Sequence, residues 1–258
     1  MQISLSGRTA IVTGGSKGIG FAVARRFAAS GADVAIVART AEPLNAAVAA
    51  ITKSTRTRVI GIAADVSKAA DIQRAHDAAM KAFGKVDIVV NNAGTSRAMP
   101  FEKVTDEILR DDLELKLFPA VRLIRLVMPQ MKERRWGRII NVLNIGAKAP
   151  RPNSMPTSIS RAAGMAMTKA LSHELAPHNV LVNALLVGLI RADQHVQRAK
   201  RTNVPLEEYY KAHEKEIPIG RLGEAEEFAN LACSLASEQG GYITGTAINV
   251  DGGRSPVV

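Results

Sequence analysis

The sequence predicts an α/β fold: a doubly wound, seven-stranded parallel sheet with helices on both faces. Two observations predict it. Short runs rich in β-branched residues alternate with longer stretches of helical pattern along nearly the whole chain, the order expected of a parallel sheet built from successive strand–helix units. The short runs are also nearly continuous in hydrophobic residues, as is typical of strands covered on both faces.

Seven of the short runs are predicted to be strands. In chain order they are Thr9–Thr13, Asp33–Ala38, Arg58–Ile62, Val86–Asn91, Arg138–Leu143, Val180–Leu186 and Ala247–Val250. Because the crossovers of such a sheet are right-handed, the loops that follow the strands gather at one edge. A ligand is expected at this edge, where the strand order reverses.

Six helical stretches lie between the strands. They are Gly18–Ser30, Glu42–Lys53, Ala69–Phe83, Glu107–Glu133, Ser158–Ala176 and Ala225–Ser237. No repeat, low-complexity tract or linker divides the chain, so we expect one domain, 1–258. The segment 189–218 interrupts the alternation and is rich in Lys, Arg and Glu. We interpret it as a lid over the ligand site or as an ordinary pair of surface helices.

The composition limits the function classes. The formal net charge is +10, but Lys and Arg are spread along the chain, and the densest cluster, 132–138, also contains Glu133. This spread argues against nucleic acid, whereas the net positive charge favours an anionic ligand or carrier. The single Cys233 and the scattered histidines predict neither a disulfide framework nor a metal site. No apolar run approaches the roughly 20 residues that cross a bilayer, and no signal sequence precedes the first strand. We therefore expect a cytoplasmic protein with no membrane partner.

A glycine-rich turn, Gly14-x-x-x-Gly18-x-Gly20, follows the first predicted strand and opens the first predicted helix. Glycines at such a turn let the backbone approach a pyrophosphate, and the helix N-terminus favours the negative charge. The setting predicts a Rossmann-type dinucleotide site. We expect the cofactor to contact the residues of the turn: Gly14, Ser16, Lys17, Gly18, Ile19 and Gly20.

The charge after the second strand indicates which nicotinamide nucleotide binds. Where an NAD site usually carries an acidic residue, this chain has Ala38 followed by Arg39. A guanidinium there suits a 2′-phosphate, and Lys17 adds a second cation. NADP(H) is therefore favoured over NAD(H). The alternative is that Arg39 is only a solvated residue at the start of a helix.

Three motifs together resemble the short-chain dehydrogenase/reductase family. They are Thr13-Gly14-Gly15-Ser16-Lys17-Gly18-Ile19-Gly20, Asn91-Asn92-Ala93-Gly94 and Val250-Asp251-Gly252-Gly253. The resemblance runs from about Ser6 to Gly253 and implies a nicotinamide-dependent oxidoreductase. It implies that Asp65 and Val66 contact the adenine, that Asn92, Ala93 and Gly94 line the cofactor, and that Gly188 lies beside the nicotinamide. Val187 stands where the family typically has proline, Ala192 stands near a usual threonine, and Asp65 could instead cap the helix that follows.

The same resemblance implies that four changed residues stand at the family's catalytic positions, which usually hold Asn, Ser, Tyr and Lys. They are Lys116, Asn144, Thr157 and Arg161. The family's tyrosine is the general acid/base for the substrate oxygen; Thr157 is too short and has no accessible anion near neutral pH. Arg161 keeps a positive charge for the ribose but is a poor proton relay. A buried Lys116 would have a lowered pKa and become a candidate proton donor, and Asn144 could hydrogen-bond a substrate oxygen.

Further candidates concern the substrate. Arg97, Arg151 and Arg191 follow the fourth, fifth and sixth predicted strands, and they suit an anionic small molecule with a carboxylate or phosphate, or a CoA-linked one. Solvated loop arginines are the alternative. Tyr209, Tyr210 and His195 lie in the segment 189–218 and are candidate replacement acids, with packing or surface exposure as the alternative for the tyrosine pair.

The resemblance also implies assembly into a homotetramer or homodimer through the helices 107–133 and 158–176. The apolar face Leu123, Leu126, Val127 and Met131 suits such an interface, although packing within one chain would give the same stripe.

Three functions stay open at this stage. The first is an NADP(H)-dependent oxidoreductase acting on a carbonyl or alcohol with an unusual proton donor. The second is a catalytically weak or inactive NADP(H)-binding relative. The third is a non-redox enzyme for elimination, hydration or hydrolysis, in which Lys116 or an arginine stabilises an enolate.

Overall fold

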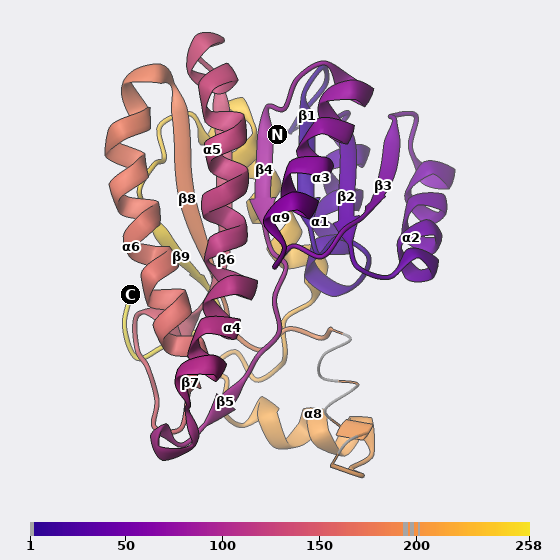
Figure 1. Ribbon diagram of the computed structural model, residues 1–258. Helices are drawn as coiled ribbons and strands as arrows, with labels where there is room; N and C mark the ends of the chain where they lie inside the picture. Colours follow the sequence, from indigo (N-terminus) through magenta and orange to yellow (C-terminus); the bar gives the residue numbers. More distant parts are fainter. Residues whose placement is uncertain (1–2, 193–195, 197–198, 201) are drawn as a thin grey trace.

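The predicted parallel sheet is confirmed by the computed structural model, which describes residues 3–192, 196, 199–200 and 202–258 (Figure 1). The strand order is β3-β2-β1-β4-β6-β8-β9, and every pairing is parallel. The strands are β1 (Thr9–Thr13), β2 (Asp33–Ala38), β3 (Val59–Ala63), β4 (Ile88–Asn91), β6 (Gly137–Asn144), β8 (Val180–Val187) and β9 (Ala247–Val250). The strand order reverses between β1 and β4, which places the expected switch point there.

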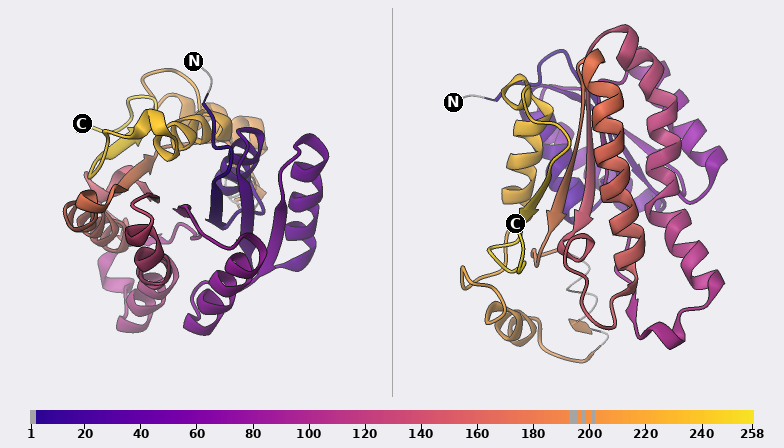
Figure 2. Two further views of the ribbon diagram at one scale, coloured as in Figure 1. Left: turned by 90° about the horizontal axis from the view of Figure 1, so that it is seen from above. Right: turned by 90° about the vertical axis from the view of Figure 1, so that its left-hand side faces the viewer.

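Helices cover both faces of the sheet, as predicted (Figure 2). One face carries α1 (Gly18–Ala29), α2 (Ala41–Ser54) and α9 (Ala225–Ala236). The other carries α3 (Ala69–Phe83), α5 (Phe118–Glu133) and α6 (Thr157–Leu175). Because strand side chains alternate in direction, Val12 of β1 packs into the first core and its neighbour Ile11 into the second.

The helix expected over Glu107–Glu133 is wrong in one respect: it is two helices. The first, α4 (Asp106–Lys116), ends at Leu117, whose φ of −107° departs from the helix, and α5 follows at once. Pro119 explains the break, because it has no N–H to donate and its ring crowds the carbonyl four residues before it. The break leaves Lys116 at the carboxyl end of α4.

Small elements that the sequence analysis did not predict hold the loops at the edge where the strands end, the carboxyl edge. Ala98–Met99 (β5) pairs antiparallel with Met155–Pro156 (β7). This pairing places the loop after β4 against the start of α6. Runs of two residues are too short to be recognised by periodicity.

The segment 189–218 contains α8 (Leu206–Glu214), which lies beyond the carboxyl edge of the sheet (Figure 1). Residues 193–195, 197–198 and 201, and with them the candidate His195, lie outside the described residues. A role for this segment as a lid stays a prediction.

The apolar stripe of α5 packs inside the chain. Leu123, Val127 and Met131 are buried in the core beneath α5, and Leu126 packs against the same core. The stripe therefore gives no independent support for an interface between copies. No helix in the described part of the chain combines the length and the apolar character needed to span a membrane.

Candidate active site at the carboxyl edge of the sheet

The glycine turn is shaped so that its backbone is open to a ligand. Gly14 and Gly18 have φ of +66° and +55°, a conformation that favours glycine. A Cβ on Gly20 would lie 2.3 Å from the carbonyl oxygen of Gly14, so no side chain fits there. Lys17, at the N-cap of α1, makes no side-chain capping hydrogen bond. This backbone and the helix N-terminus behind it fit a phosphate group.

Asn92 fixes this turn from the neighbouring strand. Its Nδ2 donates to the carbonyl oxygens of Thr13 and Gly14, at 2.9 and 3.2 Å. Thr13 Oγ1 in turn accepts hydrogen bonds from the backbone N–H groups of Asn92 and Ala93. The end of β1 and the end of β4 are thereby locked together at the switch point.

Two of the predicted cofactor contacts follow β2 and β3. Arg39 is exposed just after β2. Asp65 Oδ1 accepts hydrogen bonds from the Oγ and the backbone N–H of Ser67, at 2.8 and 3.1 Å. These hydrogen bonds, helped by the charge of Arg39, lower the pKa of Asp65. Asp65 thus stabilises the turn before α3, whereas the N-cap of that helix is Lys68.

Val66 and Gly188 are two further predicted cofactor contacts, one after β3 and one after β8. Val66 is buried in the core under α3. Gly188 sits against the end of β9, where a Cβ would lie 2.6 Å from the Cα of Asp251.

The centre of the site is a buried network around Lys116. Its ammonium, with no exposed side-chain surface, lies 2.5 Å from Asp112 Oδ1 and donates to Thr157 Oγ1 at 2.7 Å. The second oxygen of Asp112 accepts a hydrogen bond from Ser160 Oγ at 2.7 Å. Two helices, α4 and α6, are joined by these bonds. Burial lowers the pKa of Lys116 to about 8; Asp112 opposes the shift, and the cations Arg161 and Arg97 add to it.

The hydroxyl of Thr157 is fully used by the protein itself. It accepts from Lys116 Nζ and from the backbone N–H of Arg97, and it donates to the carbonyl oxygen of Arg97 at 2.6 Å. A hydroxyl has one donor and two acceptor sites. In this arrangement Thr157 therefore has no hydrogen bond left for a substrate.

Arg161 and Asn144 carry buried polar atoms without partners. Arg161 Nη1 donates to the carbonyl oxygen of Val142 at 2.8 Å. Within the described residues, Arg161 Nε and Asn144 Oδ1 are buried and make no hydrogen bond. Burial also lowers the pKa of Arg161 to about 10. An unpaired donor and an unpaired acceptor in one region are the kind of atoms that a bound ligand satisfies.

Gly94 leaves room for both cations. A Cβ at this position, whose φ is +158°, would lie 3.0 Å from Arg161 Nη2 and 3.3 Å from Lys116 Cγ. The glycine after β4 is therefore matched to the long side chains that face it.

Of the three predicted substrate arginines, Arg97 lies beside the Lys116 network: its backbone hydrogen-bonds Thr157 Oγ1, and its side chain is exposed. Arg151 lies 3.6 Å from Glu216, and Arg191 lies 3.8 and 3.5 Å from Glu214 and Glu224, so acidic side chains already face both arginines.

The tyrosine pair is buried in a separate apolar cluster. Tyr209 and Tyr210 pack with Ala199, Ile217 and Leu222, and the guanidinium of Arg191 lies 4.9 Å from the Tyr210 ring centre. Packing is the observed environment of both rings, and a role in the reaction stays a prediction.

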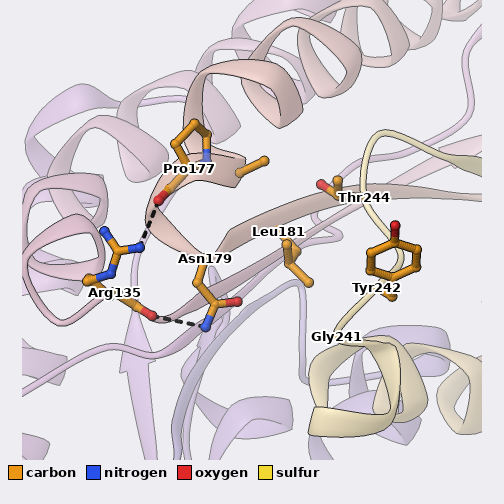
Figure 3. Close-up of a pocket in the computed structure, with 8 residues that line it drawn as sticks. Arg135, Pro177, Asn179, Leu181, Gly241, Tyr242 and Thr244 are labelled. Carbon is orange, nitrogen blue, oxygen red and sulfur yellow. Dashed lines mark hydrogen bonds between the residues drawn. The ribbon is translucent and has the colours of Figure 1, made fainter.

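A pocket of about 390 Å³ lies elsewhere, at the amino ends of β6 and β8 (Figure 3). Arg135, two residues before β6, and Asn179, directly before β8, line it. Arg135 Nη2 donates to the carbonyl oxygen of Pro177, and Asn179 Nδ2 donates to the carbonyl oxygen of Arg135. None of the residues of the Lys116 network lines it. We therefore do not assign the reaction site to this pocket, which lies at the opposite edge of the sheet from the Lys116 network.

Two residues of the network were missed by the sequence analysis, Asp112 and Ser160. Asp112 stands four residues before Lys116, the spacing at which opposite charges pair on a helix. That spacing was a usable signal. Ser160 gave none, because a serine inside a helical stretch has many ordinary roles.

The chain is similar to known reductases over nearly its whole length. Residues 14–255 match the family model described as enoyl-(acyl carrier protein) reductase. The chain is 32% identical to the 3-oxoacyl-[acyl-carrier-protein] reductase FabG of Aquifex aeolicus over 98% of this chain and 99% of that protein.

Two solved structures are similar over nearly their whole length. The L-sorbose reductase of Gluconobacter frateurii, solved with NADPH and L-sorbose, is 33% identical, with a TM-score of 0.96 and full coverage of both chains. An NADPH-bound short-chain oxidoreductase of Pseudomonas aeruginosa PAO1, described as containing an atypical catalytic center, is 34% identical, with a TM-score of 0.92 and 99% coverage of each chain.

Proposed function

Because this chain belongs to the short-chain dehydrogenase/reductase family, we propose that it is an NADP(H)-dependent oxidoreductase in which Lys116 supplies the proton. The observation that carries the proposal is the buried ammonium of Lys116, held 2.7 Å from the hydroxyl of Thr157. The substrate would be a small carbonyl compound or the corresponding alcohol.

The cofactor preference rests on charge. Arg39 and Lys17 place cations at the carboxyl ends of β2 and β1, where a 2′-phosphate would be bound. The ordered glycine turn fits the pyrophosphate, and Asp65, Val66, Ala93 and Gly188 complete the proposed contact surface. The two solved relatives described above bind NADPH, which supports NADP(H) here.

The reaction site is proposed to be the set Lys116, Asn144, Thr157 and Arg161, standing where the family usually has Asn, Ser, Tyr and Lys. The placements support this: Asn144 ends β6, and Thr157 and Arg161 lie one turn apart at the start of α6. The Pseudomonas relative with an atypical catalytic center indicates that such a departure has a precedent in this family.

Lys116 can supply the proton that a threonine cannot. When bound, the nicotinamide would supply a hydride to the carbonyl carbon, and the carbonyl oxygen would then need a proton. Lys116 Nζ gives its proton to that oxygen and is left as a neutral amine. A group with a pKa near the working pH transfers protons most effectively, and burial has brought Lys116 to about 8. Arg161 stays positively charged and offers the unpaired Nε to the ribose or to substrate oxygen.

The charge balance of the site supports an anionic substrate, CoA-linked ones included. Lys116, Arg161 and Arg97 interact electrostatically, and the only carboxylate in direct contact with this group in the described residues is Asp112. An excess of positive charge at a partly buried site favours a substrate with a carboxylate or phosphate.

The experiment has two stages. Calorimetric titration of NADPH and NADH is expected to show NADPH binding at least about ten-fold more tightly. NADPH oxidation is then followed with matched pairs of carbonyl substrates: a 2-oxo acid and its amide, and a 3-oxoacyl-CoA and a neutral ketone. Turnover that prefers the anionic member of each pair supports the proposal. Failure to bind either nucleotide would overturn it.

A second candidate is an NADP(H)-binding protein without significant turnover. It is favoured by one observation: the Thr157 hydroxyl is fully hydrogen-bonded within the protein, and the Lys116 ammonium is buried in an ion pair with Asp112. Tight NADPH binding with no oxidation of any substrate pair would select this candidate. Assembly into a homodimer or homotetramer remains a proposal from the family resemblance and is checked by light scattering.

A further inference from the structure

Asp112 is a buried carboxylate with a partner at each oxygen. Its carboxylate is only 3% exposed, yet both oxygens are used, one by Lys116 Nζ at 2.5 Å and the other by Ser160 Oγ at 2.7 Å. A buried carboxylate is expensive unless it is paired and hydrogen-bonded, and here it is both. Through Thr157 and Ser160, the pair links the end of α4 to the first turn of α6.

The same contacts fix the direction of the lysine. The chain of Lys116 is flexible and its ammonium could adopt many rotamers. Asp112 and Thr157 take two of its three N–H bonds, and Gly94 bounds the side chain at Cγ. The third N–H has no partner among the described residues. It is the donor available for a ligand.

We propose that Asp112 is a positioning residue for the reaction: it holds Lys116 as an ammonium, aimed beside Thr157, with Ser160 fixing the carboxylate. This inference rests on the proposed function, since it gives Lys116 the role of proton donor. Asp112 itself touches neither substrate nor cofactor. It acts through the ion that it holds.

The charges around Lys116 show why such a residue is needed. Arg161 faces Lys116 from α6, Arg97 faces it from the loop before β5, and Asp112 faces it from its own helix. Two of these three groups repel the ammonium and burial disfavours it. Asp112 is the only one that favours the charged form, so its removal must shift the lysine toward the neutral amine.

The test compares Asp112→Asn with Asp111→Asn, an exposed neighbour on the same helix. The dependence of kcat/KM on pH for NADPH oxidation is measured for both. Wild type and D111N should lose activity above about pH 8 as Lys116 loses its proton. In D112N this fall in kcat/KM at high pH, the alkaline limb of the profile, should move to lower pH by one unit or more. A one-unit shift lowers the protonated fraction at pH 8 from about one half to about one tenth, a loss of about five-fold.

Two further variants separate positioning from folding. Asp112→Glu keeps the charge and should restore much of the wild-type limb, and Ser160→Ala should shift it less than D112N. The NADPH dissociation constant should stay within about two-fold in all of them, because Asp112 does not face the cofactor site. An unchanged pH profile in a folded, NADPH-binding D112N would overturn the inference.

A direct titration keeps this test separate from the proposed function. Isotope-labelled lysine NMR follows Lys116 itself, with its signal assigned by the Lys116→Met variant. If the wild type turns over no substrate, the proposed function fails, but the shift of Lys116 in D112N can still be read. Equal titration of Lys116 in wild type and D112N would overturn the role of Asp112, whether or not the protein is an active reductase.

Discussion

Replacing Lys116 by methionine separates the chemistry of this residue from its contribution to stability. Lys116→Met keeps a side chain of similar length and removes the ammonium. Asp112 is then left buried, at 3% exposure, without its cation. Removing one partner of a buried ion pair typically lowers the free energy of unfolding by about 3–5 kcal/mol. The single variant should therefore be much less stable than wild type.

A second change restores the charge balance. In the double variant Lys116→Met/Asp112→Asn both members of the buried ion pair are removed together, and an amide can still accept from Ser160. Most of the lost stability should return, because replacing a whole buried ion pair is often nearly neutral. The turnover should not return. Loss of a general acid lowers kcat/KM by about 10²–10⁴-fold, in the double variant as in the single one.

The assay combines urea unfolding, NADPH calorimetry and NADPH oxidation, with Lys103→Met as a matched control at an exposed position. The control should change none of the three. A double variant that is stable, binds NADPH and keeps its turnover within about three-fold of wild type would refute the assignment of Lys116 as the proton donor.

Three other predictions follow from the same geometry. Arg39→Glu should weaken NADPH binding by about 10–100-fold and leave NADH binding nearly unchanged, which calorimetry checks; equal weakening of both nucleotides would contradict the role of Arg39. Thr157→Tyr alone should destabilise the protein by about 1–3 kcal/mol, because Lys116 Nζ lies 2.7 Å from the threonine oxygen and leaves no room for a ring. Adding Lys116→Asn should recover most of that stability in urea unfolding. If stability does not recover, the lysine is not the obstacle to the ring. The pKa of Lys116 falls from its ordinary 10.5 to about 8 on folding, so between these pH values the unfolded chain holds one proton more than the folded chain. The unfolding free energy of wild type relative to K116M should therefore rise with pH from about 8 to 10.5. A difference in unfolding free energy that stays flat across this window would show that burial does not shift the pKa of the lysine.

Much of the fold could be predicted because its signals are local. The strands Thr9–Thr13, Asp33–Ala38 and Ala247–Val250 lie where their hydrophobic runs predict them. A continuous hydrophobic run predicts both a strand and its burial on two faces, and the alternation of strands with helices predicts a parallel sheet. The break at Leu117 was missed although Pro119 was visible, because the apolar periodicity continues on both sides of it.

The residues of the candidate site could be named from the sequence, but the hydrogen bonds between them could not. Lys116 and Thr157 could be named from the sequence, since a family resemblance aligns positions. Their direct contact could not, because 41 positions separate them and only the packing of α4 on α6 brings them together. Asp112 depends on the same packing. Its carboxylate becomes a partner of Ser160 only once the two helices meet.

The glutamates facing Arg151 and Arg191 show where the sequence suggested a shared site that the structure does not assemble. Three arginines after three strands suggested a shared ligand site, and each does follow its strand region. Glu216, Glu214 and Glu224 come from the segment around α8 and from the start of α9, and they pair with two of the three. The partner of a charged residue cannot be read from the sequence. Of the three arginines, Arg97 is the one close to the Lys116 network.

The pH dependence of kcat/KM for NADPH oxidation by the wild-type protein tests the central claim most directly. If Lys116 donates the proton, activity should be constant at lower pH and fall about ten-fold per unit above about pH 8, where the buried ammonium loses its proton. The same profile for Lys116→Arg should lack this limb, because a guanidinium keeps its proton. A wild-type rate that stays level to about pH 10 would contradict the account.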